Sequence, residues 1–198
     1  SYGSRKQFFP KIQFIIDSAH GDVDRWVRSG AWRSDIPDTA ECYYRLYKFG
    51  DMHRLIAAYE SMLCEYGGMK EYVRRHAATG IEAVAAICRY FAEHNASTVV
   101  PRNTQSACKR VCMFLRWMVR TDSPVDLGLW ADIIDRRTLI MPLDTHVVQE
   151  ALRLGLLKSR TASMSTARRL TDAMLEVFPD DPLRGDFALF GLGVDEGF

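Results

Sequence analysis

The sequence has few cysteines, and none of them forms a paired metal-binding or redox motif. Its five cysteines lie at positions 42, 64, 88, 108 and 112, without a Cys-x-x-Cys pair. An odd number of scattered cysteines argues against a disulfide framework, and the spacing lacks the pattern of a zinc or iron–sulfur site. The sequence therefore predicts reduced thiols in a cytoplasmic protein that uses no metal or other cofactor.

Long apolar runs and an excess of one charge are also missing. No stretch of about 18 or more apolar residues occurs, so the sequence predicts no transmembrane segment. The 26 basic and 25 acidic residues of the 198-residue chain almost cancel. Because 47% of the residues are hydrophobic, the composition indicates an ordinary globular protein rather than a disordered chain.

Strand patterns are nearly absent, whereas helical periodicity is strong. The one short β-branched run, residues 97–100, leads directly into Pro101. Elsewhere apolar residues recur at helical spacing, and Gly67 and Gly68 are placed to end one of the helices. We predict an all-α fold in a single domain over residues 1–198, with two helical lobes as an open alternative. The predicted helices cover residues 6–18, 22–29, 39–47, 50–65, 69–76, 80–94, 106–120, 128–134, 144–154, 161–177 and 184–191.

The near-zero net charge hides an uneven distribution along the chain. Residues 101–120 contain five cationic side chains and no acidic one, and four aspartates follow between Asp122 and Asp135. A cationic segment beside an acidic one fits a local surface that faces phosphate groups. A solvated helix face is the alternative, since local charge runs of this size are common.

Two residues, Lys109 and Asp144, are the best candidates for chemistry. Lys109 lies in the first turn of an unusually apolar helix, next to Arg110. The apolar surroundings and the Arg110 charge both favour the neutral amine that Schiff-base chemistry requires. Asp144 is placed to cap the next long helix, whose N-terminus favours an ionised carboxylate. The intervening segment is long enough to bring both side chains into one cleft. An exposed lysine and a purely structural cap are the alternatives.

Two segments resemble the helix-hairpin-helix (HhH-GPD) DNA glycosylase superfamily. Residues 106–120 open a helix with a lysine, and residues 142–147 contain the Asp-Thr-His-Val sequence. The chain more closely resembles a bacterial family of uncharacterised proteins, DUF2400, which also carries the sequence of residues 186–193. The 8-oxoguanine DNA glycosylases, including the archaeal type, are similar more distantly. The DUF2400 resemblance implies further N-terminal helices ahead of residues 1–7.

The superfamily resemblance implies a monomeric, nucleoid-associated base-excision repair enzyme with a cleft between two helical lobes. A damaged nucleotide is flipped into the cleft. Lys109 attacks the sugar C1′ and releases the base, which is expected to be an oxidised purine. Lys109 then forms a Schiff base with the sugar, and β-elimination follows. Asp144 assists Lys109 and stabilises the oxocarbenium charge. The resemblance implies DNA contacts by Arg5, Lys6, Arg102, Arg110, Arg116 and His146, and a base pocket with Trp117, Asp186, Phe187 and Phe190, where core packing is the alternative for the aromatic side chains.

Three features differ between the sequence and members of this superfamily. The glycines that usually precede the lysine are replaced by Gln105 and Ala107, so the backbone clamp on DNA phosphate is expected to differ. Lys109 and Asp144 are 35 residues apart, a separation similar to that of the archaeal 8-oxoguanine type, and the iron–sulfur cysteine cluster is absent. The altered hairpin leaves open a non-catalytic DNA-binding or damage-sensing module, and a helical interaction protein without DNA affinity is a third possibility.

Overall fold

Residues 5–195 are described by the computed structural model, and their regular structure is mostly helical, as predicted. The chain divides into two compact units by its internal contacts. Unit 1 comprises residues 1–72 and 89–102, and unit 2 comprises residues 73–88 and 103–198. Two helices, α5 (Met69–His76) and α6 (Gly80–Glu93), contribute residues to both units.

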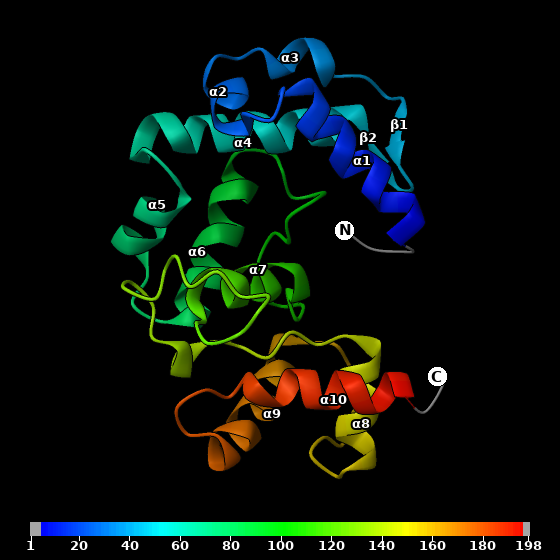
Figure 1. Ribbon diagram of the computed structural model, residues 1–198, viewed down its shortest axis with the longest axis vertical. Helices are drawn as coiled ribbons and strands as arrows, with labels where there is room; N and C mark the ends of the chain where they lie inside the picture. Colours follow the sequence, from blue (N-terminus) through cyan, green and yellow to red (C-terminus); the bar gives the residue numbers. More distant parts are fainter. Residues whose placement is uncertain (1–4, 196–198) are drawn as a thin grey trace. The chain divides into compact units, whose positions relative to one another are not determined.

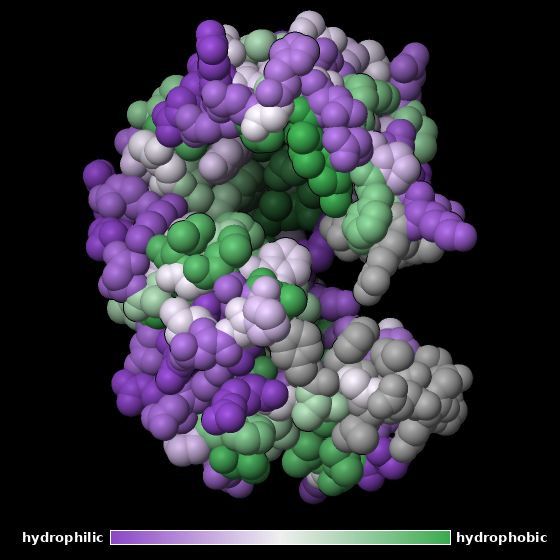
Figure 2. Space-filling view, viewed as in Figure 1, coloured by the Kyte–Doolittle hydropathy of each residue, from purple (hydrophilic) through white to green (hydrophobic). Residues whose placement is uncertain are grey.

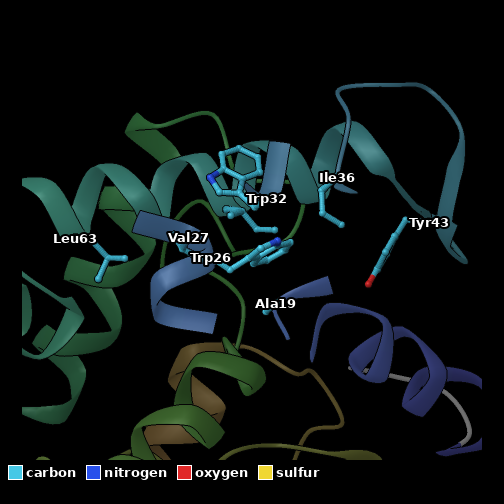
Figure 3. Close-up of a cluster of buried hydrophobic side chains, with 8 residues drawn as sticks. Ala19, Trp26, Val27, Trp32, Ile36, Tyr43 and Leu63 are labelled. Carbon is cyan, nitrogen blue, oxygen red and sulfur yellow. The ribbon is translucent and has the colours of Figure 1, made fainter. Parts of the chain in front are cut away.

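Unit 1 packs short elements against one long helix, α4 (Phe49–Tyr66) (Figure 1). Its core contains two tryptophans, Trp26 and Trp32, together with Ile36 and Leu63 (Figure 3). The indole N–H of Trp26 donates a hydrogen bond to Asp35 Oδ2 at 2.9 Å. The remaining elements are α1 (Arg5–Ser18), α2 (Val23–Arg28), α3 (Trp32–Asp35), β1 (Cys42–Tyr44) and β2 (Tyr47–Lys48).

The helix predicted over residues 39–47 is wrong, because this segment forms an antiparallel β-hairpin. Strand β1 pairs with β2 through Cys42 opposite Lys48 and Tyr44 opposite Tyr47. Arg45, in the turn, has a left-handed backbone with φ of 54°. The aromatic residues of both strands favour extended structure, and Tyr43 packs into the core of unit 1. Tertiary packing therefore overrides the weak helical pattern.

Glycine ends α4 as the sequence predicts. Gly67 adopts a left-handed conformation with φ of 79°, and its N–H donates to the Leu63 carbonyl. A second glycine, Gly80, is required at the start of α6 because the backbone of Thr138 approaches it closely. A Cβ atom there would lie 2.5 Å from the Thr138 carbonyl oxygen, and the Gly80 N–H donates to Thr138 Oγ1 at 2.8 Å.

Unit 2 contains the helices on which the candidate site is built (Figure 1). Helix α7 (Lys109–Val119) is followed by a short 3₁₀ helix, η1 (Arg136–Thr138). Helices α8 (Thr145–Arg153), α9 (Met164–Val177) and α10 (Arg184–Asp195) complete the unit, and α10 packs against α8.

The short helix predicted over residues 128–134 is also wrong, because this segment forms turns. The N–H groups of Leu127 and Gly128 donate to the Trp117 carbonyl, and the Trp130 N–H donates to the Met118 carbonyl. These bonds bind the segment to the C-terminal end of α7. The backbone groups are therefore used between segments instead of within a new helix.

Hydrophilic side chains cover much of the visible surface of each unit (Figure 2). The loop after α7 in unit 2 forms a hydrophobic patch among these hydrophilic side chains (Figure 2). Val125, Leu127 and Leu129 of this loop are each at least half exposed. None of the helices formed by residues 5–195 combines the length and apolar character needed to span a bilayer.

Candidate active site

The segment before α7 fixes the position of Lys109. Cys108 has a left-handed backbone with φ of 47°, and α7 begins at the next residue, Lys109. Just upstream, Ser106 forms an isolated β-bridge with Ser163, and the Ala107 N–H donates to the Ala162 carbonyl. The start of α7 is therefore bound to the segment that precedes α9.

Asp144 is the N-cap of α8. Its Oδ1 accepts the Val147 N–H at 2.8 Å, and its own backbone is extended. Two buried residues, Pro142 and Leu143, precede it and anchor the chain. This cap satisfies one of the free N–H groups of the helix, and the positive end of the helix dipole favours the carboxylate.

Lys109 and Asp144 lie together. The distance from Lys109 Nζ to Asp144 Oδ2 is 3.5 Å. The lysine side chain is 45% exposed, and that of the aspartate is 17% exposed. The amine therefore remains open to solvent and to a ligand, whereas the carboxylate is held from behind by the helix that it caps. A lysine and a carboxylate in this arrangement can perform nucleophilic and proton-transfer chemistry on a shared substrate.

A pocket of about 340 Å³ lies beside this pair. Its size falls at the lower end of the range for small-molecule sites. Three polar residues line it that the sequence analysis missed, namely Thr145, Gln149 and Arg160. Thr145 and Gln149 are four residues apart on α8 and therefore share one side of that helix, a signal that could have linked them to each other. Arg160 lies in a loop, and no sequence pattern indicated it. The apolar part of the lining consists of Leu143, Val148 and Ala162.

Arg116 is not available to a DNA phosphate, which corrects the role predicted for it. Its side chain is only 3% exposed. The guanidinium forms an ion pair with Asp186, and its Nε lies 3.5 Å from Asp126 Oδ1. Two turns of helix separate Arg116 from Lys109, so both lie on the same side of α7. This side of the helix is exposed at Lys109 but buried within unit 2 at Arg116, so a predicted surface cation is internal.

Arg120, just past the end of α7, is neutralised in the same way. Its Nε and Nη2 donate to Asp181, with a shortest distance of 2.8 Å, and its Nη1 donates to Asp126 at 2.6 Å. Only 6% of this side chain is exposed. Two of the five cations between residues 101 and 120 are therefore internal, so the cationic surface predicted from this segment is smaller.

Asp186, predicted to line a base pocket, lies in the first turn of α10 and is buried against Arg116. Burial raises the pKa of its carboxyl to about 6, although the Arg116 charge acts in the opposite direction. The Asp144 carboxylate raises this pKa further, and the Lys109 charge lowers it. Asp186 is absent from the lining of the pocket beside Lys109 but is electrostatically coupled to the pair.

The sequence matches one known protein family over almost its whole length. A family model described as "Protein of unknown function (DUF2400)" matches residues 1–195. The chain belongs to the DUF2400 family. Searches of curated proteins and of solved structures each found no match. The family assignment agrees with the closer of the two sequence resemblances and leaves the chemistry of the site open.

The other predicted site residues of this DUF2400 protein are dispersed. Trp117 is 42% exposed and does not line the pocket beside Lys109. Arg110 is exposed on α7, and His146 is partly buried in the first turn of α8. Lys6 and Arg102 are exposed residues of unit 1. The side chains of Arg5, Phe187 and Phe190 lie outside the described part of the structure.

The described part of this DUF2400 protein contains no cluster of side chains that could coordinate a metal ion. Across residues 5–195, no group of three or more His, Cys, Asp or Glu side chains is arranged to hold a metal ion.

Proposed function

We propose that this DUF2400 protein is a bifunctional DNA glycosylase and AP lyase that uses Lys109 as its nucleophile. The observation that supports the proposal most directly is the 3.5 Å distance between Lys109 Nζ and Asp144 Oδ2 beside a pocket. The sequence resemblance to HhH-GPD glycosylases supplies the reaction class, and an oxidised purine is the proposed leaving base. A nucleoid-associated, cytoplasmic enzyme that acts as a monomer is part of the same proposal.

The reaction begins with a deprotonated Lys109, because only the neutral amine has a lone pair for attack. The amine forms a bond to the sugar C1′ while the bond from C1′ to the base nitrogen breaks, and the base leaves with the electron pair of that bond and takes up a proton from water. Asp144 accepts a proton from the amine and stabilises the positive charge that develops on the sugar. The sugar ring then opens to a Schiff base with Lys109, and loss of the C2′ proton eliminates the 3′ phosphate.

The pocket beside the pair offers groups suited to a flipped nucleotide. Leu143, Val148 and Ala162 provide apolar surface for the face of a base. The Gln149 amide can both donate to and accept from a base edge, and the Arg160 guanidinium can bind a phosphate with two parallel hydrogen bonds. Arg110 and His146 flank the two catalytic residues in sequence and are the proposed further DNA contacts.

Borohydride trapping tests this function. Wild-type protein is incubated with duplexes that carry an abasic site or one of a panel of damaged bases, and sodium borohydride reduces any Schiff base to a stable adduct. We expect an adduct with wild-type protein and none with Lys109→Gln. Lys158→Gln, which removes an exposed lysine outside the pocket, is the matched control and should trap like the wild type.

Trapping, followed by binding measurements on the same duplexes, separates three outcomes that contradict the proposal. No Lys109-dependent adduct on any substrate rejects the lyase chemistry. Lesion-dependent binding without turnover then selects a non-catalytic damage-sensing module. No DNA affinity even at low salt rejects both and selects a helical interaction protein.

A further inference from the structure

Three buried cysteines meet behind the start of α7. Cys88 lies on α6, Cys108 immediately precedes α7, and Cys112 lies on α7. Each is no more than 3% exposed, and all three belong to unit 2. The Cys88 thiol donates to Cys108 Sγ, with 3.9 Å between the two sulfur atoms. The Ser106 side chain also lies within hydrogen-bonding distance of Cys108 Sγ, at 3.7 Å. Cys108 is therefore the centre of the cluster.

The three thiols differ in how readily they ionise. The hydrogen bond from Cys88 lowers the pKa of Cys108 below the ordinary value of a thiol, and Ser106 contributes in the same direction against the effect of burial. The same bond raises the pKa of Cys88, and burial raises that of Cys112 to about 12. Cys108 also precedes the N-terminus of an eleven-residue helix, which favours a negative charge. Cys108, the thiol with the lowered pKa, thus lies 3.9 Å from a thiol that stays protonated, which is the arrangement of a nucleophile and its resolving cysteine.

We propose that Cys88 and Cys108 form an oxidation site that closes to a disulfide when the protein meets a peroxide. The Cys108 thiolate attacks one oxygen of hydrogen peroxide, the O–O bond breaks, and hydroxide leaves. Cys108 is then a sulfenic acid. The Cys88 sulfur attacks the Cys108 sulfur, the S–O bond breaks, and the hydroxyl leaves with the Cys88 proton as water. Two thiols and one peroxide thus yield one disulfide and two waters.

Disulfide formation changes the start of α7. The sulfur atoms must move from 3.9 Å apart to about 2 Å, and Cys108 immediately precedes Lys109. The left-handed backbone of Cys108 sets the first turn of α7, so its displacement alters the position of Lys109 relative to Asp144. The disulfide itself does not depend on the chemistry of Lys109, whereas its effect on catalysis rests on the proposed function.

Peptide mapping of the peroxide-treated protein tests the site. The native full chain is exposed to hydrogen peroxide, quenched with catalase, unfolded and alkylated, and its peptides are analysed by mass spectrometry. We expect a cross-linked Cys88–Cys108 peptide that disappears on reduction. Cys112→Ser, which removes the third buried thiol, and Cys64→Ser, which removes an exposed one, should both retain it.

Variants of the pair separate the two chemical steps. Cys88→Ser, whose hydroxyl can replace the thiol as a donor to Cys108 Sγ, should leave a Cys108 sulfenic acid that dimedone captures. Cys88→Ala, which lacks that donor, should give the same dimedone adduct but only at a higher peroxide concentration. Cys108→Ser should yield neither product. The proposal is overturned if Cys108 stays reduced at peroxide concentrations that oxidise exposed Cys64, if Cys108 links to another cysteine, or if its sulfenic acid persists in the wild type.

A trapping assay then measures the effect on Lys109. Because a displacement of about 1 Å can cost on the order of 100-fold in rate, we expect at least about a tenfold loss of borohydride adduct in the oxidised protein, restored by dithiothreitol. Equal trapping by both forms contradicts control by the pair. If the reduced protein traps nothing, the proposed function fails while the mapped disulfide still stands.

Discussion

Asp144 combines two roles in one side chain. Its Oδ1 caps α8 through the Val147 N–H, and its Oδ2 faces Lys109 Nζ. The first role needs only an acceptor oxygen, whereas the second needs a negative charge. Because asparagine is as good an N-cap as aspartate, the two roles can be separated by substitution.

Asp144→Asn and Asp144→Ala should therefore differ in stability but not in chemistry. We expect Asp144→Asn to unfold at nearly the wild-type urea concentration, whereas Asp144→Ala loses about 1 kcal/mol because the cap is gone. Both should slow base release by about 100-fold or more, because neither can accept a proton from Lys109. Urea unfolding and single-turnover base release measure the two effects.

Asp22→Ala provides the control for the loss of a cap. Asp22 caps α2 of unit 1 by accepting the Arg25 N–H at 3.0 Å. Its loss should cost a similar free energy of unfolding without changing base release. Normal base release by Asp144→Asn would contradict the assigned role of the carboxylate.

Helix α7 and the residue that follows it carry a row of cations along one side, and other segments of unit 2 supply an acid to each. Asp144 faces Lys109, Asp186 faces Arg116, and Asp126 and Asp181 face Arg120. Exposure falls from 45% at Lys109 to 3% at Arg116. Buried pairs contribute little net stability, but removing one partner costs several kcal/mol, so they fix how α7 and α10 pack. The exposed pair remains available for a ligand.

The pH dependence of stability should report the burial of Asp186. Burial holds the pKa of its carboxyl at about 6 in the folded protein, against about 4 in the unfolded chain. Between these pH values the folded state binds the proton more tightly, so the contribution of Asp186 to stability is largest below about pH 4 and is lost as pH rises through about 6. The difference corresponds to about 3 kcal/mol.

Asp186→Asn should remove this dependence. Urea unfolding at about pH 4 and about pH 6.5 measures the free energy of unfolding of both proteins. The wild type should lose more stability over that interval than the variant does. The variant also changes the contact with Arg116, which faces a neutral carboxyl at about pH 4 and a carboxylate at about pH 6.5 in the wild type, so only the difference between the two pH values tests the assignment. An equal loss in both proteins would exclude a raised pKa at Asp186.

On the scale of the whole molecule, the net charge is +1 because basic and acidic side chains cancel both inside the protein and on its surface. Arg116, Arg120 and their aspartates neutralise one another inside unit 2. The cations that remain exposed and line or adjoin the candidate site are Lys109, Arg110 and Arg160. Such a small set predicts DNA binding with a modest dependence on salt, because each phosphate contact contributes about one unit to the logarithmic slope.

Arg160→Ala should reduce that slope by about one unit. Fluorescence anisotropy with a labelled abasic duplex, measured over a series of salt concentrations, gives the slope for each protein. The matched control is Arg169→Ala, which removes an exposed arginine of α9 that does not line the pocket. A slope for Arg160→Ala equal to that of the control would remove Arg160 from the DNA interface.

Most helices could be predicted because their boundaries are local in origin. Apolar spacing predicted α4 and α5 to within a residue or two, and Gly67 ends α4 as its conformational freedom predicts. The segments over 39–47 and 128–134 could not be predicted in this way. The hairpin depends on packing of Tyr43 into the core of unit 1, and the turns depend on bonds to the end of α7.

The sequence by itself determined the residue types of the candidate site and, to within three residues, the starts of the two helices that present them, since the helix predicted over 106–120 begins at Lys109 and the helix predicted over 144–154 begins at Thr145. Lys109 opens α7 and Asp144 caps α8 because capping and periodicity act within a few residues of the chain. Only the tertiary structure decided that Arg116 is internal, that Arg160 lines the pocket and that the Cys88 and Cys108 sulfurs meet. Burial and side-chain pairing depend on segments distant in sequence, which come together only when the helices pack.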